Sequence, residues 1–350
     1  MTAADQAFET ARAVTIFAPE DLRVVEAPLP ALATGFVRVR FGAGGICGSD
    51  MHYYRHARTG DFVVQAPLIL GHEIAGEVVA IAGEAPGLAV GDRVAVNPSR
   101  ACGHCARCRE GRANLCENVY FMGSASKWPH MQGGFATLFD ATPSQCVRVP
   151  DTTPYPAAAL AEPLAVCLHA VARAGDLAGR RAVVIGAGPI GLLTLMAAKR
   201  AGASEVAMVD VAPGPLAMAR KVGADAVADV SQAGALDALG PFDTAFEVSG
   251  TAAGLASAIA CVRRGGTVVQ VGNLPGGAIP VPANAVMAKE IDLLGSFRFA
   301  EEFDAAVRLI VDGEIDVMAI VTADYPLDEA VAGFRASLDR GQNAKVVLTA

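Results

Sequence analysis

The chain has 350 residues, of which 53% are hydrophobic and 18% are charged, and its formal net charge is −8. This composition supplies enough apolar side chains for sizeable cores, which excludes a disordered chain, and the length suggests about two domains. The acidic balance argues against nucleic acid or an anionic membrane surface as a partner. No window reads as a membrane span, and residues 1–10 lack the apolar core of an export signal. We therefore expect a cytoplasmic protein with reduced thiols.

Residues from about 13 to 149 are predicted to form a β-rich region with long loops. Short runs of alternating apolar residues are broken there by Gly and Pro, which is typical of half-buried strands. We expect strands at 37–41, 76–81 and 92–96.

Two loops of this region carry residue types that zinc prefers. Cys47 follows the first of these strands, and His72 and Glu73 precede the second. A thiolate, an imidazole and a carboxylate from separate loops can hold zinc and leave one coordination position for substrate. The spacing alone does not pair them, and a buried thiol and a satisfied polar histidine are the alternative interpretation.

Four cysteines at C-x2-C-x2-C-x7-C spacing predict a second metal site: Cys102, Cys105, Cys108 and Cys116. A compact loop with four thiolates can enclose zinc completely, so this site would hold structure and perform no chemistry. Disulfides or free thiols are the alternatives, and disulfides fit poorly with a chain that shows no export signal. His104 lies inside the same loop, and we expect it to face solvent.

From about 156 to 295 the pattern changes to apolar strands that alternate with Ala-rich helices. Strands are expected at 182–185, 206–209, 244–248 and 267–271, and helices at 190–201 and 215–222. This alternation predicts an α/β fold with a doubly wound parallel sheet. An edge strand near 280–286 offers a surface for pairing with a second copy. Beyond 295 we expect helices at 302–312 and 328–338 and a strand at 345–348.

The turn after the strand at 182–185 reads G-x-G-x-x-G, from Gly186 through Gly188 to Gly191. Because it follows a strand and opens a helix, its backbone amides and the helix N-terminus can receive a pyrophosphate. Asp210 ends the next strand, about 20 residues on, where a carboxylate can bind ribose hydroxyls. An acid repels a 2′-phosphate and residues 211–215 contain no Arg or Lys, so we expect NAD rather than NADP. A plain glycine-rich turn, with Asp210 as a turn former, is the alternative.

Together these motifs resemble those of the zinc-dependent medium-chain dehydrogenases, and specifically the polyol branch around sorbitol dehydrogenase. The resemblance rests on residues 45–50, 71–76, 91–94 and 162–164, the four-cysteine loop and the Gly186 turn, which occur in family order. The segment 295–299 and the run into 302–303 are most similar to the L-idonate 5-dehydrogenases. Phe299 stands where sorbitol-type enzymes often have Tyr.

The resemblance implies a GroES-like β-rich catalytic domain formed by residues 1–155 and 296–350, and a Rossmann NAD-binding domain formed by residues 156–295. It implies one catalytic zinc near Cys47, His72 and Glu73, and one structural zinc in the four-cysteine loop. Residues implied to bind the nucleotide are Gly186, Gly188, Pro189, Ile190, Gly191, Asp210, Val271, Gly272, Asn273, Ser296, Phe297 and Arg298. Residues implied to contact the substrate are Tyr53, Glu162 and Arg298. An acid at the Glu162 position is also implied to take part in catalysis by approaching the zinc, often through its bound water. Relatives are commonly homodimers or homotetramers.

The implied reaction is oxidation of a secondary alcohol in a sugar acid or polyol, with hydride transfer to NAD. Zinc can lower the pKa of a bound oxygen to about 7, so Ser49 would accept the hydroxyl proton and His52 would pass it toward solvent. A loop hydroxyl and a loop histidine without a catalytic role are the alternative interpretation of these two residues. L-Idonate, which would give 5-ketogluconate, is the first expected substrate, and L-iditol or sorbitol is the alternative. Two more distant hypotheses are a zinc-free quinone or enoyl reductase and a nucleotide-binding protein without turnover.

Overall fold

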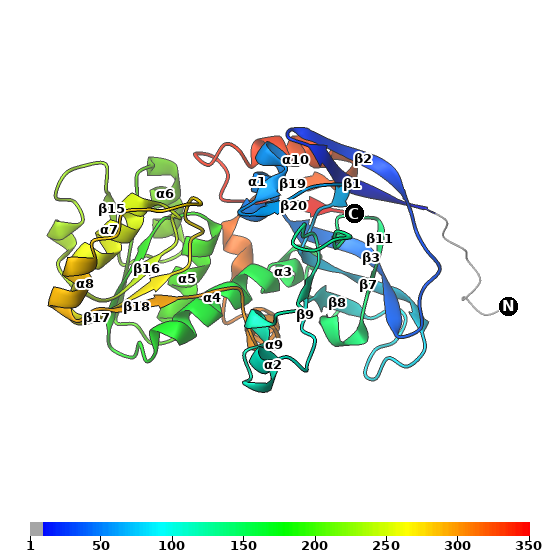
Figure 1. Ribbon diagram of the computed structural model, residues 1–350, viewed down its shortest axis with the longest axis horizontal. Coiled ribbons are helices and arrows are strands. Elements are labelled where there is room, and N and C mark those ends of the chain that lie inside the picture. The colour runs from blue at the N-terminus through cyan, green and yellow to red at the C-terminus, as the bar shows by residue number, and fades with distance from the viewer. Residues whose placement is uncertain (1–9) are drawn as a thin grey trace.

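The computed structural model describes residues 10–350, and the expectation about an export signal falls largely on residues 1–9, outside the described part. The described chain forms two lobes, one built around a parallel sheet and the other around a mixed sheet (Figure 1). The expected α/β class is confirmed by this arrangement.

A seven-stranded sheet forms the centre of the β-rich lobe, in the order β12-β8-β7-β3-β20-β19, with β11 also paired to β3. Its strands are β3 (Phe36–Gly45), β7 (Glu73–Ala82), β8 (Arg93–Val96), β11 (Leu138–Ala141), β12 (Cys146–Arg148), β19 (Val321–Pro326) and β20 (Lys345–Thr349). The last two strands come from the end of the chain, and β20 lies antiparallel to β3. The strands expected from the alternating patterns are therefore present, and the C-terminal strand completes the sheet that the N-terminal region begins.

Smaller sheets and helices surround this sheet. The other strands of this lobe are β1 (Thr10–Ala18), β2 (Asp21–Pro28), β4 (Arg58–Thr59), β5 (Phe62–Val63), β6 (Leu68–Ile69), β9 (Ser99–Arg100) and β10 (Tyr120–Phe121). Helices α1 (Gly48–His56), α2 (Ala106–Arg109) and α10 (Ala330–Ala336) also belong to this lobe. Phe135 and Phe334 are fully buried in its core, with their ring centroids 6.5 Å apart.

The second lobe contains a six-stranded parallel sheet in the order β15-β14-β13-β16-β17-β18, which is the dinucleotide-binding strand order 3-2-1-4-5-6. Its strands are β13 (Arg181–Ile185), β14 (Glu205–Asp210), β15 (Ala226–Asp229), β16 (Phe242–Glu247), β17 (Val262–Gln270) and β18 (Asp292–Gly295). The remaining helices are α3 (Tyr155–Ala159), α4 (Ala161–Ala174), α5 (Pro189–Arg200), α6 (Pro213–Lys221), α7 (Ala252–Cys261), α8 (Ala283–Lys289) and α9 (Glu302–Val311). The expected strands and helices of this region match these elements within a few residues.

The edge strand expected near 280–286 is wrong. Helix α8 occupies residues 283–289, and the strand at that edge of the sheet is β18. Pro280 and Pro282 lack the N–H that a sheet ladder needs, and Pro282 instead caps a helix of Ala-rich sequence.

The helical run Tyr155–Ala174 is, by length and composition alone, long and apolar enough to cross a membrane. However, 72% of its most apolar window is buried inside the protein. Helix α4 packs against both α5 and α9, so nearly all of its faces meet other apolar side chains. This environment explains the composition of the run as that of a central core helix.

Candidate active site

The four cysteines form one compact cluster in the loop between β9 and β10. Cys105 Sγ lies 3.5 Å from Cys108 Sγ and 3.9 Å from Cys116 Sγ, and Cys102 Sγ lies 4.0 Å from Cys108 Sγ. A tetrahedral site with Zn–S bonds of about 2.3 Å has S–S distances of about 3.8 Å, so the cluster fits zinc. All of these cysteines are free, so the disulfide alternative is not what the structure contains.

Backbone amides prepare this cluster to hold a cation. The N–H groups of His104 and Cys105 lower the pKa of the Cys102 thiol to about 6. The backbone nitrogens of Cys102 and Asn118 lie 3.2 Å and 3.3 Å from Cys116 Sγ. Such donors stabilise thiolates, which are the form that binds zinc. The His104 side chain is exposed, as expected.

Cys47, His72 and Glu73 form a second cluster, which the fold assembles from two loops. Cys47 is the N-cap of α1, and Glu73 begins β7 directly after His72. Strands β3 and β7 pair with Gly45 opposite Glu73, which brings the two loops together. One ligand atom from each of the three residues lies within 4.8 Å of the others. The antiparallel register therefore supplies the pairing that spacing alone left open.

Asp50 orients two members of this cluster. Its Oδ2 accepts a hydrogen bond from the Cys47 backbone N–H at 3.0 Å, and its Oδ1 lies 3.5 Å from His72 Nδ1. A metal-binding histidine commonly directs its second ring nitrogen at a carboxylate, which leaves His72 Nε2 for the metal. Ser49 Oγ lies 3.3 Å from that Nε2. No role was predicted for Asp50 from the sequence.

The charges around this cluster favour a bound cation. Both Glu73 carboxylate oxygens and Asp50 Oδ1 are buried without an aligned hydrogen-bond donor. Lys345 Nζ, from β20, lies 2.5 Å from Glu73 Oε2. Burial alone would lower the pKa of His72, but the charges of Asp50 and Cys47 raise it well above its usual value. A cysteine sulfur, an imidazole and a carboxylate that is paired with Lys345 alone lie in one buried place, and these are ligand types that zinc accepts.

Glu162 is a buried acid on α4 whose charge interacts with this cluster. Burial raises the pKa of its carboxyl to about 7, and the charges of His72, Glu73, Lys345 and Arg298 modify that value. A carboxyl of this kind changes its charge near neutral pH, which suits a group beside a reacting hydroxyl.

Arg298 lies in the segment between β18 and α9. Its guanidinium carbon lies 4.0 Å from the centre of the Phe121 ring and 5.0 Å from that of Phe297. Its Nη1 is buried and has no hydrogen-bond partner. Burial lowers the pKa of this side chain, while the nearby Glu162 favours its charged form. An unpaired buried N–H of a guanidinium is a position for an anionic or hydroxyl acceptor.

Helix α1 places its two candidate residues in different environments. Tyr53 is buried, and its hydroxyl oxygen accepts a hydrogen bond from the Ala125 N–H at 3.0 Å. His52 is exposed, and partial burial and the charge of the neighbouring His56 lower its pKa. Among the described residues, no hydrogen bond joins His52 to Ser49, so the relay between them stays a prediction.

The glycine-rich turn has the geometry that its motif requires. Gly186 follows β13 with φ of 107°, and Gly188 is the N-cap of α5, which begins with Pro189 and Ile190. A Cβ on Gly191 would collide with the carbonyl oxygen of Gly186, whereas a Cβ on Gly188 would meet nothing within 4 Å. The N-terminus of α5 is thus accessible at Gly188, where backbone amides can bind a phosphate.

Asp210 ends β14 beside this turn. Its Oδ2 accepts a hydrogen bond from the Ala187 N–H at 2.8 Å, and its Oδ1 accepts from Val211 at 2.7 Å and Ala212 at 3.0 Å. Asp210 therefore does stabilise the turn, as the alternative interpretation of this residue proposed. The carboxylate also lies at the carboxyl edge of the sheet, where ribose is bound in dinucleotide folds.

The other residues expected to contact the nucleotide lie at the same edge of the sheet. Residues 271–273 follow β17, and residues 296–298 follow β18. The buried Glu247, which ends β16, holds the intervening loops. Its carboxylate accepts hydrogen bonds from Gly250 N at 3.0 Å and from Gln270 Nε2 at 2.5 Å. Glu247 was not predicted from the sequence, although an acid ending an apolar strand was a visible signal.

Lys345 was not predicted either. Residues 345–348 were expected only as an apolar terminal strand, and a lysine at the start of a buried strand was the only local signal. Its partner, Glu73, lies on another strand of the same sheet, so sequence spacing could not reveal the pair.

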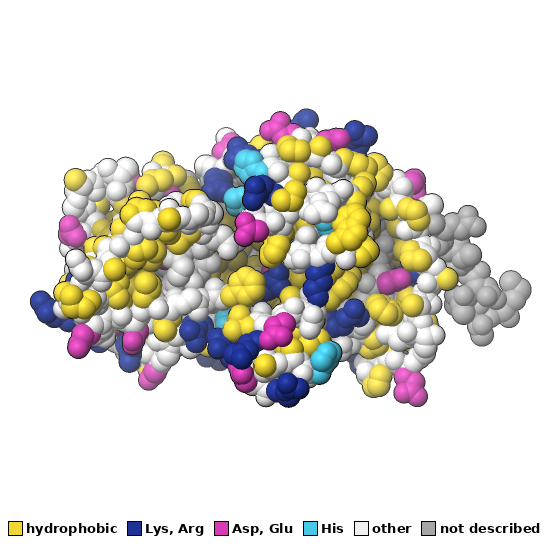
Figure 2. All heavy atoms as spheres, viewed as in Figure 1, with side chains coloured by type: hydrophobic (Ala, Val, Ile, Leu, Met, Phe, Trp, Pro, Cys, Tyr) yellow, Lys and Arg dark blue, Asp and Glu magenta, His cyan; other side chains and the backbone are white. Residues whose placement is uncertain are grey.

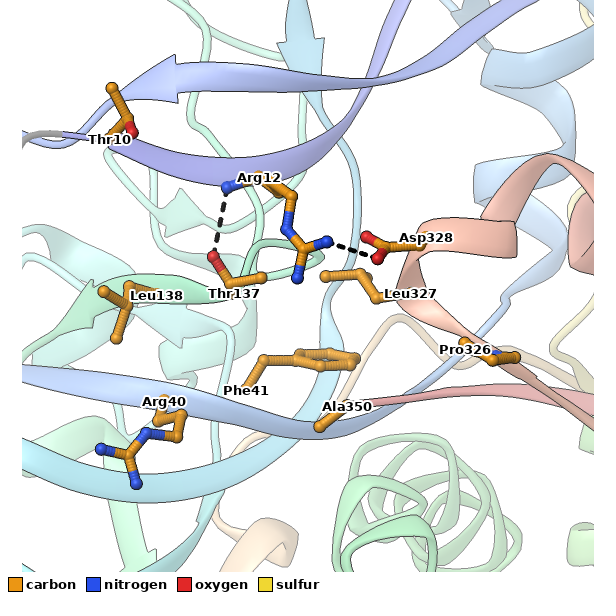
Figure 3. Close-up of a pocket in the computed structure, with 10 residues that line it drawn as sticks. All are labelled: Thr10, Arg12, Arg40, Phe41, Thr137, Leu138, Pro326, Leu327, Asp328 and Ala350. Atoms are coloured by element: carbon orange, nitrogen blue, oxygen red, sulfur yellow. Dashed lines mark hydrogen bonds and ion pairs between the residues drawn. The ribbon is translucent and has the colours of Figure 1, made fainter.

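A cavity of about 430 Å³ lies elsewhere in the β-rich lobe, lined by parts of β1, β3 and β11 and by the segment near Leu327 (Figure 3). Arg12 and Asp328 pair across it, and both side chains are half exposed. The residues that line it include none of the expected site residues.

Comparisons with known proteins agree with the two metal clusters and the parallel sheet. The alcohol dehydrogenase GroES-like domain family matches residues 33–151, and the zinc-binding dehydrogenase family matches residues 189–312. The chain is 40% identical over 314 residues to the L-idonate 5-dehydrogenase (NAD(P)(+)) of Escherichia coli strain K12, covering 89% of this chain and 90% of that protein. It is 36% identical over 324 residues to the sorbitol dehydrogenase of Bacillus subtilis strain 168, covering 91% of each.

The fold comparison gives the same result. The crystal structure of L-idonate 5-dehydrogenase from Escherichia coli K-12 matches with a TM-score of 0.92 at 37% sequence identity, over 97% of this chain and 98% of that chain.

Proposed function

This chain belongs to the zinc-dependent alcohol dehydrogenase family and its polyol and sugar-acid branch, and we propose that it oxidises a secondary hydroxyl of L-idonate with NAD as hydride acceptor. The reaction takes a hydride from the carbinol carbon and a proton from its hydroxyl, and it yields 5-ketogluconate, NADH and a proton. The fold is a GroES-like β-rich domain with a Rossmann domain, as the motifs led us to expect.

The proposed catalytic zinc ligands are Cys47, His72 and Glu73, supported by their mutual proximity and by the buried Glu73 Oε1, which has no hydrogen-bond partner. Zinc bound there would act as a Lewis acid that lowers the pKa of the substrate hydroxyl. Ser49 Oγ, 3.3 Å from His72 Nε2, is the proposed first proton acceptor. His52, exposed on the same helix, is the proposed group that passes the proton to solvent.

The unpaired Nη1 of Arg298 is the single observation that carries the choice of a sugar acid. A buried guanidinium N–H without an acceptor is unfavourable until a ligand supplies one, and a carboxylate does so with a charge-assisted hydrogen bond. Glu162 and Tyr53 are the proposed partners of the substrate hydroxyls. Burial raises the pKa of Glu162 to about 7, so near neutral pH its carboxyl group can either accept or donate a hydrogen bond.

NAD rather than NADP is the proposed cofactor. The Asp210 carboxylate lies where the ribose of the nucleotide is expected and would repel a 2′-phosphate. The residues proposed to bind it are Gly186, Gly188, Pro189, Ile190, Gly191, Asp210, Val271, Gly272, Asn273, Ser296, Phe297 and Arg298.

The test is NADH formation with L-idonate, D-gluconate, L-iditol, sorbitol and xylitol, using wild-type enzyme and Arg298→Ala. We expect activity on L-idonate, and about a tenfold or greater rise in its KM in the variant, because a charge-assisted hydrogen bond is lost. Equal activity on neutral polyols, with no effect of the variant on the aldonate-to-polyol ratio, would contradict the proposal.

A neutral polyol such as L-iditol or sorbitol is the second candidate. The Phe121 ring lies 4.0 Å from the Arg298 guanidinium carbon, and this cation–π contact offsets part of the cost of burying its charge. In that case Arg298 needs only a hydroxyl as its acceptor, and the neutral polyols would dominate the screen.

Metal analysis separates these candidates from a zinc-free reductase and from a nucleotide-binding protein without turnover. The clusters predict two zinc ions per chain. Cys47→Ser should lose one of them together with alcohol oxidation, whereas a variant of the four-cysteine loop should lose the other. A Cys47→Ser enzyme with full activity would refute the catalytic assignment.

We propose domain boundaries at 155/156 and 295/296. Strands β13 to β18 all lie within residues 156–295 and form one sheet, while β19 and β20 join the sheet of the N-terminal region. Expression of residues 156–295 alone, followed by hydrogen exchange on its strands, would test whether that part folds independently.

A homodimer or homotetramer is proposed through the β18 edge. Leu293 on β18 is 40% exposed, and Met287 on the preceding helix α8 is 70% exposed. Figure 2 shows hydrophobic side chains gathered over the outer end of the parallel-sheet lobe, where α7 and α8 lie. Light scattering should show an oligomer that Leu293→Lys dissociates, because a strand edge with apolar side chains pairs readily and a charge on it prevents pairing.

The cytoplasm is the proposed location. Its reducing conditions would keep the free cysteines available as zinc ligands. Cell fractionation would test this.

A further inference from the structure

Asn114 connects the four-cysteine loop to the segment that carries Arg298. Asn114 is buried in the short helical turn Ala113–Leu115, between the last two cysteines of that loop. Its Nδ2 donates a hydrogen bond to Phe297 O at 2.9 Å and lies 3.5 Å from His169 Nε2 on α4. Because Phe297 directly precedes Arg298, an amide of the loop proposed to hold structural zinc fixes the peptide beside the proposed substrate-binding residue.

The backbone of Arg298 needs such an anchor. Its φ is 53°, in the left-handed region, which a residue with a Cβ adopts only where its surroundings enforce it. On the N-terminal side, Ser296 N donates to Gln270 O at 2.9 Å, and Arg173 Nε donates to Gly295 O at 3.0 Å. These bonds hold the end of β18, and the bond from Asn114 is the next one along the chain.

His169 extends this connection to the C-terminal side of Arg298. Its Nδ1 lies 2.8 Å from Glu302 Oε1, at the start of α9. Glu302 Oε2 in turn accepts a hydrogen bond from Ala300 N at 2.7 Å. A largely buried series of polar contacts thus runs from the four-cysteine loop through α4 to α9, and Arg298 lies between its two ends.

We propose that Asn114 is a positioning residue for substrate recognition: through Phe297 O it holds Arg298 in the backbone conformation that presents its guanidinium to the acidic end of the substrate. This inference rests on the proposed function, because it takes Arg298 as the carboxylate-binding residue. The four-cysteine loop then affects which substrates bind, in addition to stabilising the fold.

The test compares wild-type holoenzyme with Asn114→Asp, Arg298→Ala and the double variant. The Asn114→Asp substitution keeps the size of the side chain but removes its N–H donor. We expect it to raise the KM for L-idonate about 5-fold to 20-fold, from the loss of one buried donor, with kcat and the KM for L-iditol little changed. In the Arg298→Ala background the same substitution should add nothing.

Two further measurements separate positioning from a general loss of structure. Hydrogen exchange should rise in peptides covering 296–301 of Asn114→Asp and stay unchanged in peptides covering α5, while the zinc content stays at its wild-type value. Arg109→Gln is the control, because Arg109 is an exposed residue of the same loop. It should leave every readout unchanged.

The outcomes distinguish this inference from the proposed function. An Arg298→Ala variant with a wild-type KM for L-idonate removes Arg298 from recognition and overturns both. If Arg298→Ala raises the KM for L-idonate as expected but Asn114→Asp leaves it unchanged, only the role of Asn114 is overturned. Additive effects in the double variant also overturn it, because Asn114 would then act independently of Arg298.

Discussion

Lys345 supplies a buried positive charge beside Glu73, at the point where zinc would also neutralise that carboxylate. Both side chains are at most 2% exposed. We expect Lys345→Met to reduce the free energy of unfolding of the zinc-free protein by about 3 kcal/mol or more, because a buried carboxylate loses its partner. The loss should be smaller with zinc bound. Urea unfolding with and without a chelator measures the difference.

The control is Lys199→Met. Lys199 pairs with Asp225 at 2.8 Å, but both side chains are 38% exposed. Such a surface pair contributes about 1 kcal/mol or less, independently of zinc. The account of the buried pair would be contradicted if both variants lost the same free energy of unfolding. It would also be contradicted if the loss in Lys345→Met were the same with and without zinc.

Glu162 should make the free energy of unfolding of the zinc-free protein depend on pH. Burial raises its pKa from 4.5 to about 7 in the folded state. Between these values the folded state binds more protons than the unfolded state, so stability falls as pH rises from 4.5 through 7. Glu162→Gln removes this dependence. The difference in unfolding free energy between wild type and variant, measured across this range, should change steadily, and parallel curves would refute the raised pKa.

Within the glycine turn that joins β13 to α5, two neighbouring glycines should respond differently to alanine. At Gly191 a Cβ would meet the Gly186 carbonyl oxygen, so Gly191→Ala should lower both the melting temperature and NADH affinity. At Gly188 a Cβ meets no protein atom within 4 Å, so Gly188→Ala should keep the melting temperature. It should still weaken NADH binding at least several-fold, because the backbone must approach the pyrophosphate there.

Thermal unfolding and fluorescence titration with NADH check this pair. If Gly188→Ala binds NADH normally, the pyrophosphate does not lie on that turn, and the turn serves the fold alone.

Elements with a strong local pattern were predictable from the sequence. Strands β13, β14 and β16 and helix α5 follow from apolar runs and the glycine turn, and the four-cysteine spacing alone indicated its cluster. Helix α8 was not predictable from the sequence, because a short apolar stretch that follows prolines is compatible with either a strand or a helix.

Residues whose roles depend on distant pairing were not predictable. Lys345 reaches Glu73 only because β20 returns to pair with β3, and Asn114 reaches Phe297 across 183 positions of the chain. A single sequence contains no signal for such pairs unless a motif already assigns them. The cluster of Cys47, His72 and Glu73 is an intermediate case. The resemblance suggested the three residues, and the β3–β7 register brings them together.

At the scale of the whole molecule, the two lobes also touch far from the zinc clusters. The segment between α10 and β20 reaches toward α6 (Figure 1), and a Cβ built on Gly214, at the start of α6, would collide with the Gly341 carbonyl oxygen. Gly214 follows Asp210 by one short turn, so this contact lies beside the expected ribose site. The absence of a side chain at Gly214 therefore has a steric reason, because it lets the lobes approach each other next to the expected nucleotide site.

Gly214→Ala should separate the lobes at this contact. The φ of Gly214 is not in the left-handed region, and alanine is a better helix former than glycine, so the melting temperature should fall less than in Gly191→Ala. The Gly341 carbonyl must retreat, so we expect NADH to bind about 3-fold to 10-fold more weakly, a cost of about 1 kcal/mol. Gly276→Ala is the control, because its Cβ meets nothing within 4 Å. An unchanged NADH dissociation constant in Gly214→Ala would mean that the contact between the lobes does not help to hold the nucleotide.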